Sequence, residues 1–268
     1  MVEESSDTAL AITGATGGVG GRIASRLAGL EHPQRLVVRD AARAPDLPGA
    51  GVAEASYEDQ ESMRRALSGT RTLFMVSARE SPDRVLRHAA AVDAAVAAGV
   101  ERIVYLSFLN AAPDATLTFA RDHWHTEEHV RSTGIRYTFL RDGPYLDYLP
   151  ALAGADGVIR GPAGEGRVGA VARDDVAEVA VAVLLGEGHD GWTYDVTGPE
   201  TIVEAYESRS SHGAPWEVEG WVTSYAAIAA GEMDVVSDTV GKLTGHAPMG
   251  LAEFLRRYPE SYRHLVRT

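Results

Sequence analysis

A glycine-rich turn near the start of the chain constrains the possible fold more than any other feature. The apolar run Ala9 to Ile12 predicts a buried strand, and the pattern Gly14-x-x-Gly17-x-x-Gly20 follows it directly. The amphipathic segment Val19 to Leu27 then predicts a helix. A strand, a glycine turn and a helix in this order are typical of a site for the pyrophosphate of a dinucleotide.

Each of the three positions requires glycine for a different physical reason in such a site. Gly14 allows the tight turn after the strand, Gly17 lets the backbone approach the pyrophosphate, and Gly20 lets the helix pack close to the strand. The free N–H groups at the helix start would face the phosphates. A purely structural turn in another α/β protein is the alternative. The loop residues expected to contact the cofactor are Gly14, Thr16, Gly17, Gly18, Val19 and Gly20.

Strands and helices are predicted to alternate after this turn. Strands are expected at 34–38, 51–53, 72–76, 102–106 and 137–140, and helices at 58–67, 82–99 and 119–132. Strands separated by helices of this length imply a parallel, doubly wound sheet. We therefore predict an α/β protein with a Rossmann-type cofactor domain over residues 1–145.

The pattern changes in the remainder of the chain, residues 146–268. Short strands are expected at 158–159, 168–171 and 192–196, with a helix at 174–185 and polar breaks at 209–215 and 244–248. These features predict a small, mostly helical C-terminal lobe that is intertwined with the first domain and closes over its cleft.

Ligands of doubly wound sheets bind beyond the carboxyl ends of the strands. Several polar and aromatic residues follow predicted strands directly and are expected to line the cofactor cleft. They are Ser56, Tyr57, Ser77, Ala78, Ser107, Phe108, Pro144 and Tyr145.

The end of the second predicted strand indicates which dinucleotide binds. An NAD site usually places an acidic residue there for the ribose hydroxyls. Here Val38 is followed by Arg39 and Asp40, with Arg43 close behind. A guanidinium suits the 2′-phosphate of NADP(H), because it can form paired, charge-assisted hydrogen bonds. NADP(H) is therefore favoured over NAD(H), although Asp40 could bind a ribose and Arg39 could be a surface residue.

Composition excludes several function classes. The formal net charge of −13 argues against a nucleic-acid surface. The chain has no cysteine, so disulfides, thiolate nucleophiles and cysteine metal sites are excluded. No apolar run approaches the ~20 residues that span a bilayer, and the acidic N-terminal segment does not fit a signal peptide. A cytoplasmic protein without a membrane partner is expected.

Five segments together resemble a known group: GATGGVG, VVRD, YLSFL, TEEHVRSTGIRYTFLRDGPY and ARDDVAEVAVAVL. They are similar to the atypical short-chain dehydrogenase/reductase superfamily, in its NmrA-like branch, and especially to type-2 NADPH:quinone oxidoreductases. The resemblance covers nearly the whole chain. It implies a Rossmann domain that binds NADP(H), in a group that contains both reductases and non-catalytic regulators. The chain departs from the pattern after 197–200, where the lobe looks shortened.

Catalysis is harder to assign than the cofactor. Short-chain dehydrogenases normally use Tyr-x-x-x-Lys, in which the lysine lowers the tyrosine pKa. Lys242 is the only lysine of this chain, so no such motif can be written. Phe119 and His123 occupy the two positions on the helix instead. We name His123 and Tyr145 as catalytic candidates; a hydrogen-bonded helix histidine is the alternative for His123.

A second pattern lies on the same predicted helix. His125, Glu128 and His129 match H-x-x-E-H, which in some proteases binds zinc. The short pattern arises readily by chance in a chain with nine histidines. The predicted strands and helices around it also alternate as in a Rossmann domain. No metal is therefore expected.

Two function classes remain. The first is an NADPH-dependent oxidoreductase that passes a hydride to a quinone-like or conjugated carbonyl substrate, with the aromatic side chains Tyr145, Tyr148 and Trp192 favouring a substrate pocket. The second is a non-catalytic NADP(H) sensor, favoured by the missing tyrosine and lysine. An activated acceptor needs little acid assistance, so the first class is preferred.

Overall fold

A seven-stranded parallel sheet forms the centre of the molecule. The structure is a computed structural model that describes residues 9–154, 162–203 and 214–265. The strands of the main sheet are β1 (Leu10–Thr13), β2 (Gln34–Val38), β3 (Ala50–Glu54), β4 (Thr72–Val76), β5 (Arg102–Phe108), β6 (Arg136–Asp142) and β8 (Thr193–Val196). Their order is β3-β2-β1-β4-β5-β6-β8 with every pair parallel, which confirms the predicted doubly wound sheet.

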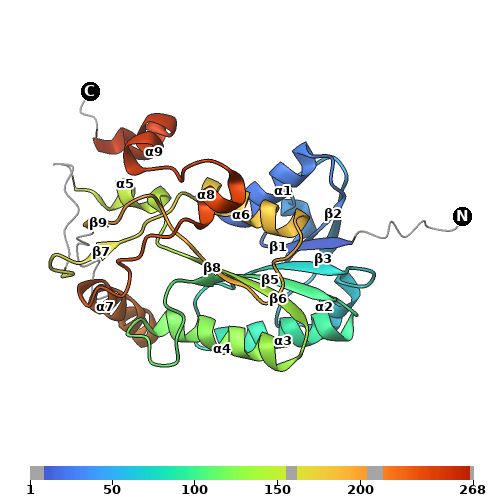
Figure 1. The fold of residues 1–268 in the computed structure, drawn as a ribbon. Coiled ribbons are helices and arrows are strands. Elements are labelled where there is room, and N and C mark those ends of the chain that lie inside the picture. The colour runs from blue at the N-terminus through green and yellow to red at the C-terminus, as the bar shows by residue number, and fades with distance from the viewer. Residues whose placement is uncertain (1–8, 155–161, 204–213, 266–268) are drawn as a thin grey trace, which may run out of the picture.

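Helices cover both faces of this sheet (Figure 1). One face carries α1 (Gly18–Gly29), α6 (Arg173–Leu185) and α8 (Thr239–Thr244), and the other carries α2 (Gln60–Ala66), α3 (Arg84–Ala97) and α4 (Thr118–Ser132). Ile23 and Leu27 of α1 pack against a valine stripe of α6 that includes Val176 and Val179, all fully buried. Burial of such side chains is the main stabilising term for a layered fold.

The glycine turn has the geometry that its sequence predicts. Gly14 has φ +68°, a left-handed conformation that glycine adopts without strain. A Cβ on Gly20 would lie 2.3 Å from the carbonyl oxygen of Gly14. Only glycine at position 20 therefore allows α1 to start this close to the end of β1.

The C-terminal lobe adds α5 (Leu149–Leu152), β7 (Arg167–Val168), β9 (Ile202–Val203), α7 (Pro215–Ala229) and α9 (Leu251–Arg257). β7 and β9 pair in an antiparallel ladder. A third core, which includes Leu149, Ile228 and Phe254, holds the lobe together. The predicted strand 168–171 is shorter than expected, because only Val168 belongs to a ladder and Val171 forms an isolated bridge with Tyr145.

The predicted strand 158–159 and most of the polar break 209–215 lie outside the described residues. The later half of the chain contributes β8 and α6 to the main sheet and its helical layer. The domain boundary at 145 and the intertwining of the two parts stay predictions. In the described ranges no helix combines the length and apolar character that crossing a bilayer requires.

Candidate active site at the carboxyl edge of the sheet

The loop between β1 and α1 forms a cradle suited to an anion. The Gly17 N–H donates to the Gly14 carbonyl at 2.8 Å and closes the turn. No side chain caps the start of α1 and its first turn contains no acidic residue, so the helix N-terminus keeps its positive potential. Thr16, Gly17 and Gly18 are exposed here, whereas Val19 is buried in the core and offers only its backbone N–H. These features fit the pyrophosphate of a dinucleotide.

Arg39 follows β2 at the same edge of the sheet and is exposed, as is Arg43. Asp40 caps the short 3₁₀ helix Ala41–Arg43, because its carboxylate accepts from the Ala42 N–H at 3.0 Å. Asp40 therefore has a structural role that the sequence left open. Among the described residues, Arg39 has no acidic partner, which suits a 2′-phosphate as ligand.

The polar groups at the other strand ends are largely occupied by partners within the protein. The Tyr57 hydroxyl donates to Thr13 or the Val76 carbonyl, at 2.6 and 2.7 Å, and burial raises its pKa. The Ser107 hydroxyl donates to Glu127 at 2.6 Å. The structure thus places Tyr57 and Ser107 at the predicted edge, with hydroxyls that face neighbouring elements. Ser56, Ser77, Ala78, Phe108 and Pro144 lie there half-buried.

His123 lies inside a buried hydrogen-bonded network. Its Nε2 lies 3.0 Å from a guanidinium nitrogen of Arg84, and its Nδ1 lies 2.9 Å from the Tyr105 hydroxyl. Arginine can only donate, so Nε2 accepts and the ring proton is on Nδ1. Burial, reinforced by the charge of Arg84, lowers the His123 pKa well below its usual value. His123 is therefore neutral at pH 7, with both ring nitrogens in use.

Tyr145 has an equally confined hydroxyl, which donates to the carboxyl group of Asp142. Burial raises the Asp142 pKa to about 7, and burial together with the Asp142 charge raises the pKa of Tyr145 well above its usual value. The geometry disfavours both His123 and Tyr145 as proton donors to a substrate, and their catalytic roles stay predictions.

The H-x-x-E-H residues face different partners. His129 bonds to Asp93 at 2.8 Å, whereas Glu128 pairs with Arg131. His125 contacts the ring of Trp124. The three side chains therefore do not converge on one point. In the described part of the chain, the one group of three potential metal ligands is Asp175, Glu178 and His246 on the α6 side, where Arg26 already pairs with Glu178 at 3.1 Å.

Three residues at this edge of the sheet were not predicted from the sequence. Arg173 begins α6 and lies against Gly18, Asp142 lies under Tyr145, and Arg84 holds His123. One signal was available for Arg173, since a basic residue at a helix N-terminus opposes the helix dipole. Nothing in the local pattern marks Arg84 or Asp142.

A family match and individual relatives of this chain agree on the same family. Residues 14–187 match the family described as NAD(P)H-binding. An NAD(P)H azoreductase of Xenophilus azovorans is 29% identical over 281 residues, which cover 94% of this chain and 98% of that protein. Quinone oxidoreductase 2 of Escherichia coli is 36% identical over 196 residues, covering 70% of this chain and 68% of that one.

Solved structures support the same placement. The NADPH-dependent quinone oxidoreductase QOR2 from Escherichia coli, complexed with NADPH, superposes with a TM-score of 0.82 at 30% identity, over 92% of this chain and 99% of that one. Nmra, a negative transcriptional regulator, shares the fold at 17% identity with a TM-score of 0.76, over 95% of this chain and 97% of that one. This chain belongs to the NAD(P)H-dependent oxidoreductase family with the NmrA-like, atypical short-chain dehydrogenase/reductase fold, and its cofactor is NADP(H).

Proposed function

We propose that this protein reduces a quinone-like or conjugated carbonyl substrate with NADPH, without a tyrosine–lysine catalytic pair. The observation that carries the proposal is the paired state of both catalytic candidates, His123 and Tyr145, which lie with Ser107 and Phe108 at what we call the reaction side of the cofactor site. His123 is neutral and bonded at both nitrogens, and the Tyr145 hydroxyl donates to Asp142. Such a site suits an acceptor that needs little help from an acid.

Phe119 occupies the place on α4 where a catalytic tyrosine would stand. Its ring packs against α7, and a Cβ on Gly220 would lie 2.2 Å from the ring tip. The Trp216 ring lies 6.5 Å from it in an edge-on arrangement. Phe119 thus joins the lobe to the sheet domain, which supports a packing role for this position.

The cofactor supplies a hydride when it is bound. A quinone that accepts a hydride becomes a hydroquinone anion, which then takes one proton from water. The residues of the chain hold the dinucleotide through the glycine loop and Arg39, while the half-buried ring of Phe108 offers an apolar surface beside the reaction side. Acid catalysis normally contributes about 10²–10⁴-fold, and an activated acceptor makes that contribution largely unnecessary.

The relatives fit this substrate class. They are an NAD(P)H azoreductase and a quinone oxidoreductase. We therefore propose an aromatic or quinone-like small molecule as the acceptor for this chain. The absence of a nucleic-acid partner and the cytoplasmic location stay predictions.

A non-catalytic NADP(H) sensor is the second candidate, and the buried neutral state of His123 is the observation that favours it. NADPH oxidation by the purified protein against a panel of benzoquinones and naphthoquinones separates the two functions. Turnover with at least one quinone is expected. Tight NADPH binding in calorimetry, without turnover of any acceptor, would reassign the protein as a sensor.

A further inference from the structure

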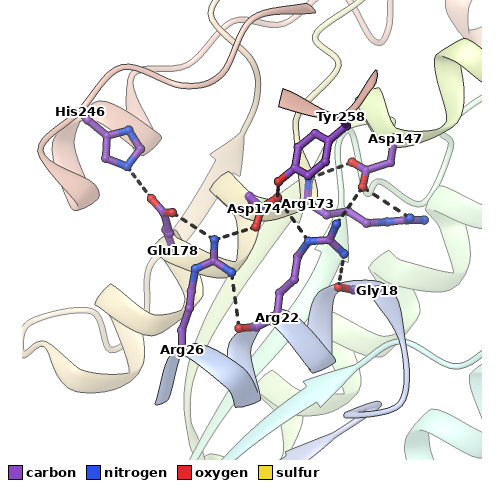
Figure 2. Close-up of polar contacts among 9 residues, drawn as sticks. All are labelled: Gly18, Arg22, Arg26, Asp147, Arg173, Asp174, Glu178, His246 and Tyr258. Atoms are coloured by element: carbon purple, nitrogen blue, oxygen red, sulfur yellow. Dashed lines mark hydrogen bonds and ion pairs between the residues drawn. The ribbon is translucent and has the colours of Figure 1, made fainter. Parts of the chain in front are cut away.

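Arg173, the first residue of α6, lies directly over the phosphate cradle. A Cβ on Gly18 would lie 3.0 Å from both Cδ and Nε of Arg173. Figure 2 shows the side chain extending across the start of α1 from the side of α6. Because position 18 has no side chain, the arginine can approach the backbone of the loop this closely.

Two aromatic rings hold the guanidinium in place. Its central carbon lies 4.3 Å from the ring centroid of Tyr148 and 4.7 Å from that of Tyr145. Both distances are within the range of cation–π attraction. The backbone N–H of Arg173 also donates to Asp147 at 3.1 Å, which fixes the start of α6.

The charge of Arg173 is only loosely neutralised. Its nearest carboxylate oxygen, on Asp147, lies 3.7 Å away, beyond hydrogen-bonding distance, and Arg22 shares this carboxylate at 3.4 Å. No hydrogen bond from the guanidinium to another described residue occurs, although it carries five N–H donors. By contrast, the neighbouring Arg26 pairs with Asp174 at 2.7 Å and with Glu178 at 3.1 Å.

The side chain is also placed against the usual electrostatic preference. A cation at the first position of a helix opposes the helix dipole. At the same time it faces the N-terminus of α1, which is itself positive. Two positive groups this close to one another are stabilised when an anion binds to both of them.

We propose that Arg173 binds the pyrophosphate of NADP(H) and that Tyr145 and Tyr148 serve as its platform. The cradle then has two sides, the glycine loop of α1 and the first residue of α6. The inference rests on the NADP(H) site and does not depend on the proposed acceptor. It also gives Tyr145 a positioning role through its ring, which leaves the hydroxyl free to bond to Asp142.

Calorimetric titration of the whole protein with NADPH, NADH and 2′-AMP tests the proposal. Arg173→Met keeps the aliphatic volume and removes the charge. It should weaken NADPH and NADH alike, by about tenfold or more, since hydrogen bonds to charged groups have this magnitude. Binding of 2′-AMP, which has no pyrophosphate, should stay within twofold. Arg256→Met is the matched control, because Arg256 is exposed on α9 and its guanidinium donates to the Ala252 carbonyl of the same helix.

A failure of this inference and a failure of the proposed function would give different results, because the first is measured by cofactor affinity and the second by quinone reduction. Wild-type affinity of Arg173→Met for both dinucleotides would overturn the inference, even if quinone reduction is observed. Equal weakening of 2′-AMP would also overturn it, because the arginine would then act on the adenosine side. Should Arg173→Met fail to fold, Tyr148→Ala removes an exposed part of the platform. It should weaken both dinucleotides a few-fold, and unchanged affinities would contradict the proposal.

Discussion

The two ends of the cofactor site at the carboxyl edge of the sheet differ in how their polar groups are used. At the phosphate end, Arg39 has no acidic partner among the described residues, the guanidinium of Arg173 has only a loose contact with Asp147 at 3.7 Å, and the start of α1 lacks an acidic residue. At the reaction end, Ser107, His123 and Tyr145 are all bonded to other side chains. One end is prepared for a ligand with several negative charges, while the other offers few free polar groups.

Binding and chemistry are therefore expected to depend on different ends of the site. Cations that are unpaired or only loosely paired beside a helix N-terminus stabilise a polyanion strongly, so we expect the phosphate end to set affinity and cofactor choice. A reaction end with satisfied internal hydrogen bonds is rigid, and it selects its substrate by shape and by intrinsic reactivity. Substitutions at the phosphate end should therefore change binding, whereas those at the reaction end should change stability more than rate.

The largest effect is expected at Gly17. Gly17→Val should abolish measurable dinucleotide binding while the protein stays folded, because the side chain would fill the space of the pyrophosphate. Calorimetry with NADPH and circular dichroism measure the two properties. Gly51→Val is the control, since a Cβ at Gly51 meets no atom within 4 Å and the residue lies in β3. Unchanged affinity of Gly17→Val would remove the basis for the phosphate cradle.

The next effect concerns cofactor choice. Arg39→Ala should weaken NADPH by roughly 1.5–3 kcal/mol, the range for hydrogen bonds to charged groups, and leave NADH nearly unchanged. The reason is that only NADPH carries the 2′-phosphate. Titration of both cofactors and of 2′-AMP measures this difference, with Arg256→Ala as an exposed control. Equal losses for NADPH and NADH would show that Arg39 does not contact the phosphate.

A smaller effect on rate is expected at the reaction end. His123→Ala should lower kcat/KM for quinone reduction by less than about tenfold, below the usual contribution of a general acid. It should cost about 1–3 kcal/mol in the free energy of unfolding, because a buried donor of Arg84 loses its acceptor. Stopped-flow rates and urea denaturation test the two parts. A thousandfold loss of rate with intact NADPH affinity would make His123 an essential acid.

Restoring the tyrosine–lysine pair should not create a ketone reductase. In Phe119→Tyr with His123→Lys, the new hydroxyl would extend from the ring tip toward α7, where Gly220 already lies close. The lysine would enter the buried position beside Arg84 and face a like charge. Assays with simple ketones should show no turnover above the wild-type level. Efficient reduction would mean that the reaction end is open enough to orient a carbonyl.

The smallest effect concerns pH and Asp142. Its pKa in the folded protein is raised to about 7, so the folded state binds more protons than the unfolded state between pH 4 and 7. Stability contributed by this group therefore falls as pH rises through that window. Asp142→Asn removes this pH dependence. The difference in free energy of unfolding between the variant and the wild type should therefore increase, in favour of the variant, by about 1 kcal/mol for each pH unit that the pH rises within this window.

Urea denaturation at pH 4.5, 5.5, 6.5 and 7.5 measures the difference between the two proteins. Asp175→Asn is the comparison, because burial raises the pKa of Asp175 to about 6. The stability gained by Asp175→Asn over the wild type should stop rising near pH 6, whereas that gained by Asp142→Asn should continue to rise to about pH 7. A constant difference between wild type and Asp142→Asn at all four pH values would contradict the raised pKa.

The local patterns of the sequence were sufficient for the sheet and for one side of the cradle. β2 and β4 coincide with the predicted ranges 34–38 and 72–76, because runs of branched apolar residues are read directly as buried strands. The positive φ of Gly14 and the close approach at Gly20 follow from the spacing of three glycines in one turn. The family of the chain and its cofactor were predicted from the same segments and are confirmed.

The state of the side chains at the reaction end could not be predicted in this way. His123 is neutral because folding buries it and places Arg84, on another helix, as a donor to its ring, and Tyr145 is occupied because β6 places Asp142 beneath it. Arg173 meets Gly18 across more than 150 positions of sequence. Backbone preferences and the order of strands and helices follow from neighbours along the chain, so they could be predicted from the sequence. The pairing of polar groups depends on residues that only folding brings together, so it could be found only in the folded structure.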